Sequence, residues 1–319
     1  MSANRSTIKI GTRGSPLALY QAHATAAALK SVDPSLNRED AFEIVVIRTA
    51  GDRIQDRRLA ELGGKAMFTQ EIERALAAGE IDLAVHSAKD LETELADGTT
   101  LAAVLPRADR RDALIAPKFG SIENLPQGGT VGTASLRRQA QLLQLRPDLK
   151  VVLFRGNVET RLQKLADGQV DATFLAAAGL QRLNKADAIT ALLEPAQMMP
   201  AAGQGAIVIQ ARETDAKLLQ ALAQINHPAS AAEVLAERAT LASLNGSCDT
   251  PVGVMAVIES EDSLSVTAVI LRPDGSKAWR SSTSGSIADA EILGKEVGTS
   301  LASQCDPVLL LPTPGASTG

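Results

Sequence analysis

The segment Ile8–Pro16, IKIGTRGSP, predicts a short strand that passes through a turn into a helix. Ile8–Ile10 suits the strand. Ser15 is a favourable N-cap because its hydroxyl can accept an N–H of the first helical turn, and Pro16 suits the first helical position. Apolar residues continue at helical spacing on one face, at Leu19, Ala22, Ala26 and Leu29.

A second segment, Gly132–Ser135 (GTAS), stands in the same context. It ends the predicted strand Thr130–Gly132 and opens a predicted helix over residues 135–145. The echo predicts two related α/β lobes, each with a helix N-terminus at the top of a sheet. Such termini attract anions through free N–H groups and the helix dipole. Two of them facing each other across a hinge would form a ligand cleft.

Strand and helix patterns alternate over the first two thirds of the chain, which predicts crossover units and mainly parallel sheets. Residues 49–64 are polar without a clear period and predict a mobile loop. A helix is predicted around Phe68–Leu76 and another over residues 157–166. The other predicted strands here are Phe42–Ile47, Ile81–Val85, Leu101–Leu105, Ala113–Ala116, Val151–Phe154, Ala172–Leu175 and Ala206–Gln210, the last returning to the first sheet.

The last ninety or so residues have a different pattern. A helix over 228–244, alternating strands at Val252–Ile258 and Leu264–Leu271, a turn at Arg272–Gly275 and a closing helix over 287–302 predict a separate α+β module. The tail, 312–319, is expected to fray. The predicted domains are 1–105 with 206–224, then 106–205 with hinges near 106–110 and 200–205, then 225–319.

Composition excludes several classes of function. A net charge of −5 and 2% aromatic residues argue against nonspecific duplex binding and against single-strand binding by stacking. Two cysteines and three histidines lack metal-ligand spacing, so no metal site is predicted. No P-loop or G-x-G-x-x-G fingerprint is present. Without an apolar span or a signal-peptide pattern, the prediction is a cytoplasmic protein with reduced thiols.

Cations stand at the predicted strand ends and first helical turns, where ligands bind in open α/β sheets. Any single arginine can be a solvated surface residue, but the recurrence predicts a polycarboxylate or phosphate ligand. Arg137 and Arg138 follow Ser135 closely, and cations at a helix N-terminus are disfavoured unless an anion joins them. The full set is Arg13, Lys89, Arg137, Arg138, Arg155, Arg161 and Arg182.

Two further segments carry candidate chemistry. In His86–Asp90, Asp90 can face a ligand cation or N–H while Ser87 and Lys89 bind anionic groups; the alternative is a solvated Asp–Lys pair. Cys248 lies between polar residues after a helix, which favours a loop over the buried small hydrophobe that we expect for Cys305. A cysteine hydrolase would need a histidine beside Cys248.

Eight segments taken together resemble one family, the porphobilinogen deaminases, also called hydroxymethylbilane synthases. Any one of them is a weak match, but all eight stand in the family's order and cover nearly the whole chain. They are GTRGSPLAL (11–19), GGKAMF (63–68), VHSAKD (85–90), GTASLRR (132–138), RGNVETR (155–161), AGLQRL (178–183), GQGA (203–206) and GSCDTPVG (246–253).

The resemblance implies an α/β fold of three domains. The first two resemble periplasmic-binding-protein lobes around a cleft, and the third is a small α+β domain with the cofactor cysteine, which matches Cys248. In this family that cysteine holds a dipyrromethane through a thioether. The enzyme is a transferase of porphyrin and haem biosynthesis: it joins four porphobilinogen units head to tail, releases ammonia, and hydrolyses off linear hydroxymethylbilane. A monomer without nucleic-acid or membrane partners is implied.

The family's catalytic aspartate matches Asp90, whose carboxylate would stabilise positive charge at a pyrrole nitrogen. Lys65 and Phe68 match a segment over the cleft. The remaining expected cofactor- and substrate-binding residues are Arg13, Ser15, Ser87, Lys89, Thr133, Ser135, Arg137, Arg138, Arg155, Gly156, Arg161, Arg182 and Gln204.

Two departures from the family pattern stand out: Gly246-Ser247 where many members have Gly-Gly, and no proline shortly after Asp90. The alternative function is a non-catalytic two-lobe anion-binding protein. It leaves Cys248 and the third module unexplained.

Overall fold

The computed structural model describes residues 7–53, 68–245 and 250–310. These residues fall into two compact units. The first unit holds residues up to 53, 68–107 and 206–231, and the second holds 108–205 and the described residues from 232 onward. Among the residues described, no helix is both long enough and apolar enough to cross a membrane.

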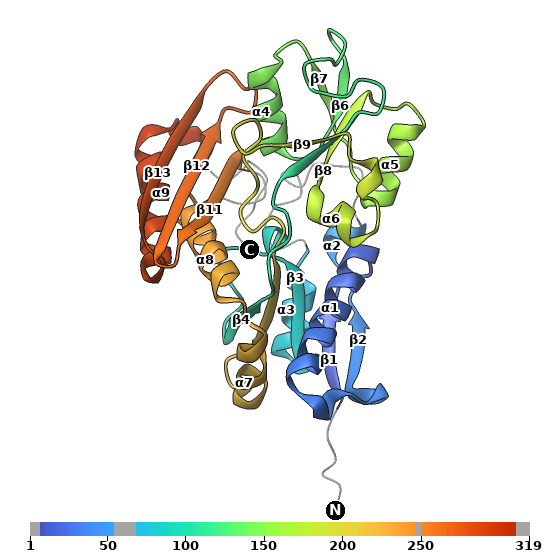
Figure 1. The fold of residues 1–319 in the computed structure, drawn as a ribbon, viewed down its shortest axis with the longest axis vertical. Helices are drawn as coiled ribbons and strands as arrows, with labels where there is room; N and C mark the ends of the chain where they lie inside the picture. Colours follow the sequence, from blue (N-terminus) through green and yellow to red (C-terminus); the bar gives the residue numbers. More distant parts are fainter. Residues whose placement is uncertain (1–6, 54–67, 246–249, 311–319) are drawn as a thin grey trace, which may run out of the picture. The chain divides into compact units, whose positions relative to one another are not determined.

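The first unit is built on a five-stranded sheet of order β2-β1-β3-β10-β4 (Figure 1). β1 pairs in parallel with β2 and β3, whereas β10 runs antiparallel to both β3 and β4. The strands are β1 (Ile8–Thr12), β2 (Phe42–Val46), β3 (Leu83–Ser87), β4 (Thr99–Val104) and β10 (Ile207–Arg212).

Helices cover both faces of this sheet because side chains alternate along each strand. Leu83 and Val85 of β3 pack in one core with α1 (Pro16–Val32) and α7 (Ala216–Ile225). Ala84, between them, packs in a second core with α3 (Gln70–Ala77). The buried strand is therefore apolar on both sides until it ends in polar residues.

The second unit contains a sheet of the same kind, of order β7-β6-β8-β5-β9. β6 pairs in parallel with β7 and β8, and β5 runs antiparallel to β8 and β9. The core with Phe174 includes Leu142 of α4, and the core with Leu175 includes Val158 of α5 and Leu180 of α6. The elements are β5 (Asp112–Ile115), β6 (Thr130–Gly132), β7 (Lys150–Val152), β8 (Ala172–Ala176), β9 (Ala191–Leu193), α4 (Leu136–Leu145), α5 (Val158–Ala166) and α6 (Ala177–Arg182).

The two sheets share one topology, which confirms the two related α/β lobes predicted from the echo of GTRGS and GTAS. In each sheet the reversed strand is the first strand after the chain crosses from the other unit. β5 follows the crossing at residues 107–108, and β10 follows the crossing at residues 205–206. The sheets are thus mainly parallel in strand direction, as expected, but each carries one reversed strand.

A third sheet, the antiparallel β11-β12-β13, lies in the second unit. α9 packs on β12 and β13, and a core including Ala236 of α8 and Val297 of α9 fills the space between helices and sheet (Figure 1). This confirms a separate α+β module. Its elements are α8 (Pro228–Ser243), β11 (Val252–Ser260), β12 (Ser263–Leu271), β13 (Ala278–Ser286) and α9 (Ala290–Gln304). Cys305 is buried in this core, as expected for a small hydrophobe, and burial raises the pKa of its thiol.

Some local predictions were wrong. Residues 50–53, expected in a loop, form the short helix α2 (Ala50–Arg53), and the rest of that predicted loop lies outside the described residues, as does the tail 312–319. β3 starts at Leu83 rather than Ile81, because Ile81 still bonds back to Ala75 at the end of α3. β9 and α6 were not predicted, since three and six residues are too short to show a period. The ten-residue helix α7 was not predicted either.

The turn between β12 and β13 gives a stability prediction. Gly275 has φ +73°, and a Cβ there would lie 2.6 Å from the carbonyl carbon of Leu143 in α4. We expect Gly275→Ala to lower the free energy of unfolding by about 2–4 kcal/mol, through left-handed strain and backbone overlap. The measurement is urea unfolding followed by circular dichroism.

Gly168→Ala is the matched control, because Gly168 has φ +76° but nothing within 4 Å of its added Cβ. It should lose only about 1–2 kcal/mol, the cost of left-handed strain alone. Equal losses in the two variants would contradict close packing of the turn on α4.

Candidate functional site

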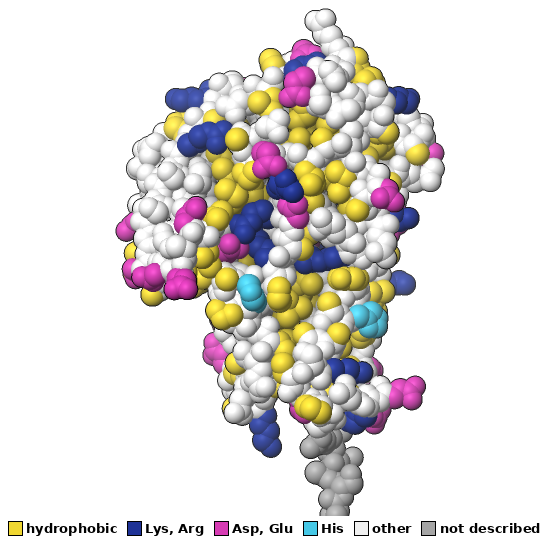
Figure 2. Space-filling model, in the orientation of Figure 1, with side chains coloured by type: hydrophobic (Ala, Val, Ile, Leu, Met, Phe, Trp, Pro, Cys, Tyr) yellow, Lys and Arg dark blue, Asp and Glu magenta, His cyan; other side chains and the backbone are white. Residues whose placement is uncertain are grey.

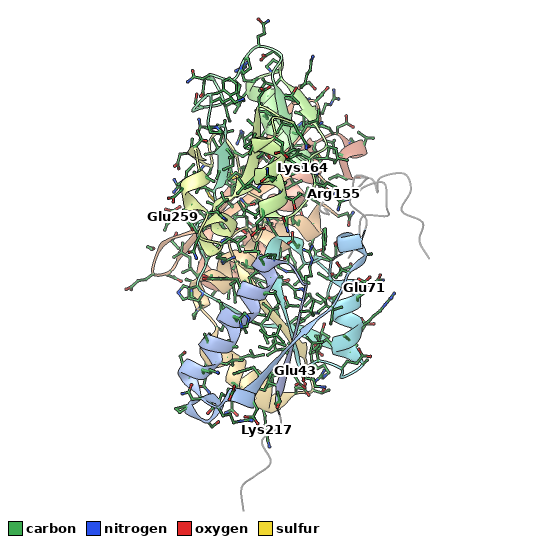
Figure 3. The ribbon with its side chains drawn as sticks, turned by 90° about the vertical axis from the view of Figure 1, so that its right-hand side faces the viewer. Glu43, Glu71, Arg155, Lys164, Lys217 and Glu259 are labelled. Atoms are coloured by element: carbon green, nitrogen blue, oxygen red, sulfur yellow. The ribbon has the colours of Figure 1, made fainter. Side chains whose placement is uncertain are left out.

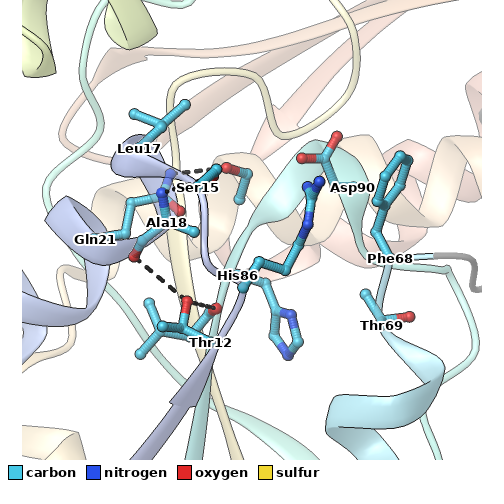
Figure 4. Close-up of a pocket in the computed structure, with 12 residues that line it drawn as sticks. Thr12, Ser15, Leu17, Ala18, Gln21, Phe68, Thr69, His86 and Asp90 are labelled. Carbon is cyan, nitrogen blue, oxygen red and sulfur yellow. Dashed lines mark hydrogen bonds between the residues drawn. The ribbon is translucent and has the colours of Figure 1, made fainter. Parts of the chain in front are cut away.

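A pocket of about 50 Å³ opens in the first unit where β1, β3 and α1 meet (Figure 4). Polar side chains from separate parts of the chain line it, with Leu17, Ala18 and Val85 between them. The volume has room for a few water molecules. Of the predicted site residues, the pocket wall includes Arg13, Ser15, Phe68, Ser87 and Asp90.

The N-terminus of α1 forms one wall of this pocket. Ser15 caps the helix as predicted: its Oγ accepts the N–H of Ala18 at 3.3 Å. Gln21, one turn further along, donates through Nε2 to Ser87 Oγ at 2.7 Å and so ties the helix to the end of β3. Since residues at the start of a helix leave N–H groups without helical partners, this wall favours a bound anion.

Arg13 and Phe68 are stacked in the pocket. The guanidinium carbon of Arg13 lies 4.2 Å from the centroid of the Phe68 ring. A guanidinium stacked on an aromatic face is held in one plane, and its N–H groups then point outward along the edge of that plane. Phe68 and Asp90 both line this pocket (Figure 4).

Asp90 is the last residue of a short 3₁₀ helix, η4 (Ala88–Asp90), that follows β3 directly. The N–H of Ala88 donates to the carbonyl of Ala206 at 3.1 Å, which fixes this helix to the start of β10. The Asp90 carboxylate makes no hydrogen bond or ion pair with any described residue. It is therefore available to a ligand in the pocket. Lys89, next to it, is half-buried and does not line this pocket.

The predicted residues of α4 form a second cluster, in the second unit. Ser135 caps α4 by accepting the N–H of Arg138 at 3.4 Å, and Thr133 Oγ1 accepts the N–H of Ser135 at 3.1 Å. Arg137 and Arg138 are buried rather than exposed, at 5% and 6%. The anion that joins them at this helix N-terminus is Asp112 of β5, which is fully buried.

Electrostatics keep Asp112 ionised. Burial by itself favours the neutral carboxyl, but the guanidinium groups of Arg137 and Arg138 outweigh it and hold the pKa of Asp112 well below its ordinary value. Burial lowers the pKa of Arg137, and Asp112 opposes that effect. With both guanidinium groups protonated, the cluster carries one net positive charge.

Arg155 and Arg161 lie near the N-terminus of α5. Asn157 caps this helix by accepting the N–H of Thr160 at 2.8 Å, and Lys164 Nζ donates to the carbonyl of Arg155 at 3.1 Å (Figure 3). Gly156 has φ +130°, and a Cβ there would be 2.9 Å from Thr160 Cβ. Glycine is thus required for the approach from β7 into α5.

Arg182 and Gln204 make hydrogen bonds between the second lobe and the segment that leads out of it. Arg182 Nη2 donates to the carbonyl of Gly205 at 2.7 Å, and Gln204 Nε2 donates to Asp112 Oδ1 at 3.1 Å. Arg182 is the last residue of α6, so placing it at a strand end or in a first helical turn was wrong; the short helix had no visible period.

Lys65 and Cys248 lie outside the described residues. Gln21 and Asp112 are two of the polar residues that sequence reasoning missed. Both had a signal: Gln21 occupies the buried face of α1 beside Ala18 and Ala22, and Asp112 begins an otherwise apolar strand.

Among the residues described, no group of three or more His, Cys, Asp or Glu side chains could hold a metal ion.

Solved structures with some likeness to the chain include the periplasmic VFT2 domain of BvgS from Bordetella pertussis. It has 18% identity and a TM-score of 0.39, over 70% of this chain and 87% of that one. The substrate-binding protein of an amino acid ABC transporter gives 15% identity and a TM-score of 0.37, over 69% of this chain and 91% of that one.

Sequence comparisons are far closer. A porphobilinogen deaminase from Paracoccus denitrificans is 50% identical over 294 residues, 92% of this chain and 93% of the relative. A chloroplastic porphobilinogen deaminase from Oryza sativa subsp. japonica is 47% identical over 308 residues, 96% of this chain and 86% of the relative.

Two family models match consecutive parts of the chain. The model described as "Porphobilinogen deaminase, dipyromethane cofactor binding domain" matches residues 8–220, and the model of the C-terminal domain of the same enzyme matches residues 231–303. The first match contains the pocket with Asp90 and the arginine cluster at α4, and the second contains the third sheet. The resemblance read from eight short segments is confirmed: this chain belongs to the porphobilinogen deaminase family.

Proposed function

We propose that this chain is a transferase that joins four porphobilinogen molecules head to tail on a covalently bound dipyrromethane and releases linear hydroxymethylbilane by hydrolysis. The observation that carries the proposal is the family match over residues 8–220 and 231–303. The alternative, a non-catalytic two-lobe anion-binding protein, is not favoured, because it does not account for the match of the C-terminal domain.

The described residues suit a dipyrromethane. Each pyrrole of this group bears an acetate and a propionate, so a site for it must supply several donors to carboxylates. Arg137 is 5% exposed, and its Nε and Nη2 make no hydrogen bond with any described residue. A guanidinium that the protein holds by one nitrogen and that keeps donors unused on its other edge fits a carboxylate arm. When bound, dipyrromethane supplies the pyrrole α-carbon to which the first unit is joined.

Asp90 is our candidate for the catalytic residue. In each addition the aminomethyl C–N bond of porphobilinogen breaks and ammonia leaves. The methylene carbon bonds to the α-carbon at the end of the growing chain, and the proton lost there balances the one carried off by ammonia. Positive charge develops on the pyrrole nitrogen, and a fixed carboxylate beside that N–H stabilises it. Asp90 lines the pocket without a described protein partner, which supports this role.

Cys248 is proposed as the attachment point through a thioether, and the arginines with Lys65 and Lys89 as partners of the carboxylates. We also propose the domains 1–105 with 206–224, 106–205 and 225–319. The change of compact unit at residues 107–108 and 205–206 supports the hinges near 106–110 and 200–205.

A cytoplasmic monomer without nucleic-acid or membrane partners completes the proposal. The net charge of −5 supports the absence of a nucleic-acid partner. On the face drawn in Figure 2, Lys and Arg side chains lie among Asp and Glu side chains rather than in a continuous basic stripe.

Attachment to Cys248 is tested by intact mass. Protein purified with its cofactor should exceed the sequence mass by one dipyrromethane, and Cys248→Ser should remove the excess, since serine forms no thioether. Cys305→Ser is the control and should keep it, because Cys305 is buried in the third-domain core. If an active wild-type preparation has the mass of the unmodified sequence, attachment of the cofactor to Cys248 is rejected.

The charge on Asp90 is tested by Asp90→Asn. We expect kcat to fall by about 10²-fold or more with the fold retained, because the amide cannot stabilise the developing cation. Asp97→Asn is the control: Asp97 is exposed in the same unit and does not line the pocket. Steady-state turnover and circular dichroism are the measurements, and a near-normal kcat in Asp90→Asn would reject the role.

The Arg13–Phe68 stack is tested by Phe68→Leu. Without the ring, the Arg13 guanidinium loses the aromatic face on which it stacks, and we expect KM for porphobilinogen to rise by roughly 2–5-fold, the equivalent of 0.5–1 kcal/mol. Trp279→Leu is the matched control, since Lys277 lies 4.7 Å from the Trp279 centroid on the third sheet. If both variants raise KM equally, or neither does, the stack has no part in binding.

A further inference from the structure

Asp112 is a buried carboxylate of the second lobe that accepts four hydrogen bonds, and the reaction chemistry does not use it. It begins β5 and is fully buried. Its Oδ2 accepts from Arg137 Nη1 at 2.6 Å, and its Oδ1 accepts from Arg138 Nε at 3.0 Å and Nη2 at 2.6 Å. Gln204 Nε2 adds a fourth bond, to Oδ1 at 3.1 Å.

The two arginines are used unequally. Arg138 donates through Nε and Nη2 to Asp112 and through Nη1 to the carbonyl of Phe174 at 2.9 Å. Arg137 uses only Nη1, which donates to Asp112 and to the carbonyl of Met199 at 2.7 Å. Its Nε and Nη2 have no hydrogen-bond partner among the described residues, so one edge of the guanidinium is left for another acceptor.

The single carboxylate between two guanidinium groups also sets the net charge of the cluster. Two buried arginines without it would repel each other and the positive end of α4. Two carboxylates would leave no net charge for a ligand. With Asp112 alone, the cluster carries one net positive charge, held beside a capped helix N-terminus.

We propose that Asp112 is a positioning residue that holds Arg137 and Arg138 so that the unused edge of Arg137 meets one carboxylate of the ligand. This rests on the proposed function, in which the ligand is a dipyrromethane or the chain growing from it. Asp112 acts through the arginines and does not touch the ligand.

Positioning by Asp112 and simple electrostatics predict opposite changes in ligand binding for Asp112→Asn. Removing a negative charge from an anion site raises the local positive potential, so charge alone predicts tighter binding by Asp112→Asn. Positioning predicts weaker binding, because the arginines lose the acceptor that orients them. The two accounts therefore differ in direction and not only in size.

The experiment uses the full-length chain produced without porphobilinogen and then titrated with it. The readout is the intact-mass increase from cofactor assembly, and the porphobilinogen concentration that gives half of it. For Asp112→Asn we expect this concentration to rise on the order of tenfold or more, as when an orienting partner of a ligand-binding group is lost. Thermal unfolding is recorded in parallel.

Glu237→Gln is the control matched for burial. Glu237 is also fully buried and accepts the N–H of Gly203 at 2.6 Å and of Ala256 at 2.9 Å, but it makes no bond to Arg137 or Arg138. It should lose stability and keep the wild-type half-loading concentration. A shift in this variant as large as that in Asp112→Asn would overturn the proposal, because loading would then follow stability alone.

If Asp112→Asn does not fold, Asp112→Glu carries the test. It keeps every buried charge paired but displaces the carboxylate, so we expect a smaller rise in the half-loading concentration. Wild-type loading in a folded Asp112→Asn or Asp112→Glu, or tighter loading in either, overturns the positioning role while leaving the proposed function intact. A wild-type chain that gains no mass overturns both.

Discussion

The second unit depends on a buried carboxylate, Asp112, shared by two buried guanidinium groups. Burying any of these charges alone would cost several kcal/mol, so each requires the others in place. The cluster draws together the start of β5, the first turn of α4 and Gln204, on the chain that leaves this lobe. An element that shifted would leave an unpaired buried charge, and this constraint fixes the geometry around the α4 N-terminus.

The two lobes use one topology and treat their cations differently. Each has a strand that runs into a serine-capped helix, at Ser15 and at Ser135. In the first lobe the nearby cation, Arg13, is stacked on Phe68. In the second, Arg137 and Arg138 are tied to Asp112. An aromatic face orients a guanidinium through stacking, whereas a carboxylate orients it through hydrogen bonds and also offsets its charge, so the same scaffold positions its arginines in two different ways.

Much of the fold was predictable because its longer elements carry strong local signals. The helices at 136–145 and 158–166 begin at capping residues, and the strands at 130–132 and 172–176 are β-branched or apolar. The short elements α2, α6 and β9 were missed, since a period cannot be read from three to six residues, and the ten-residue helix α7 was missed as well. The reversed strands were also invisible, because pairing direction depends on which part of the chain returns to the sheet.

Of the candidate site, the sequence by itself determined the residue types, the helix caps and, through eight ordered segments, the family. These are local features, carried by neighbours in the chain. Only the tertiary structure decided which partners those residues have. Asp112 meets Arg137 across 25 positions, and Gln21 meets Ser87 across 66. Burial and pairing of charges arise from packing between distant segments, so an arginine predicted to face a ligand proved to be held first by a carboxylate of the protein.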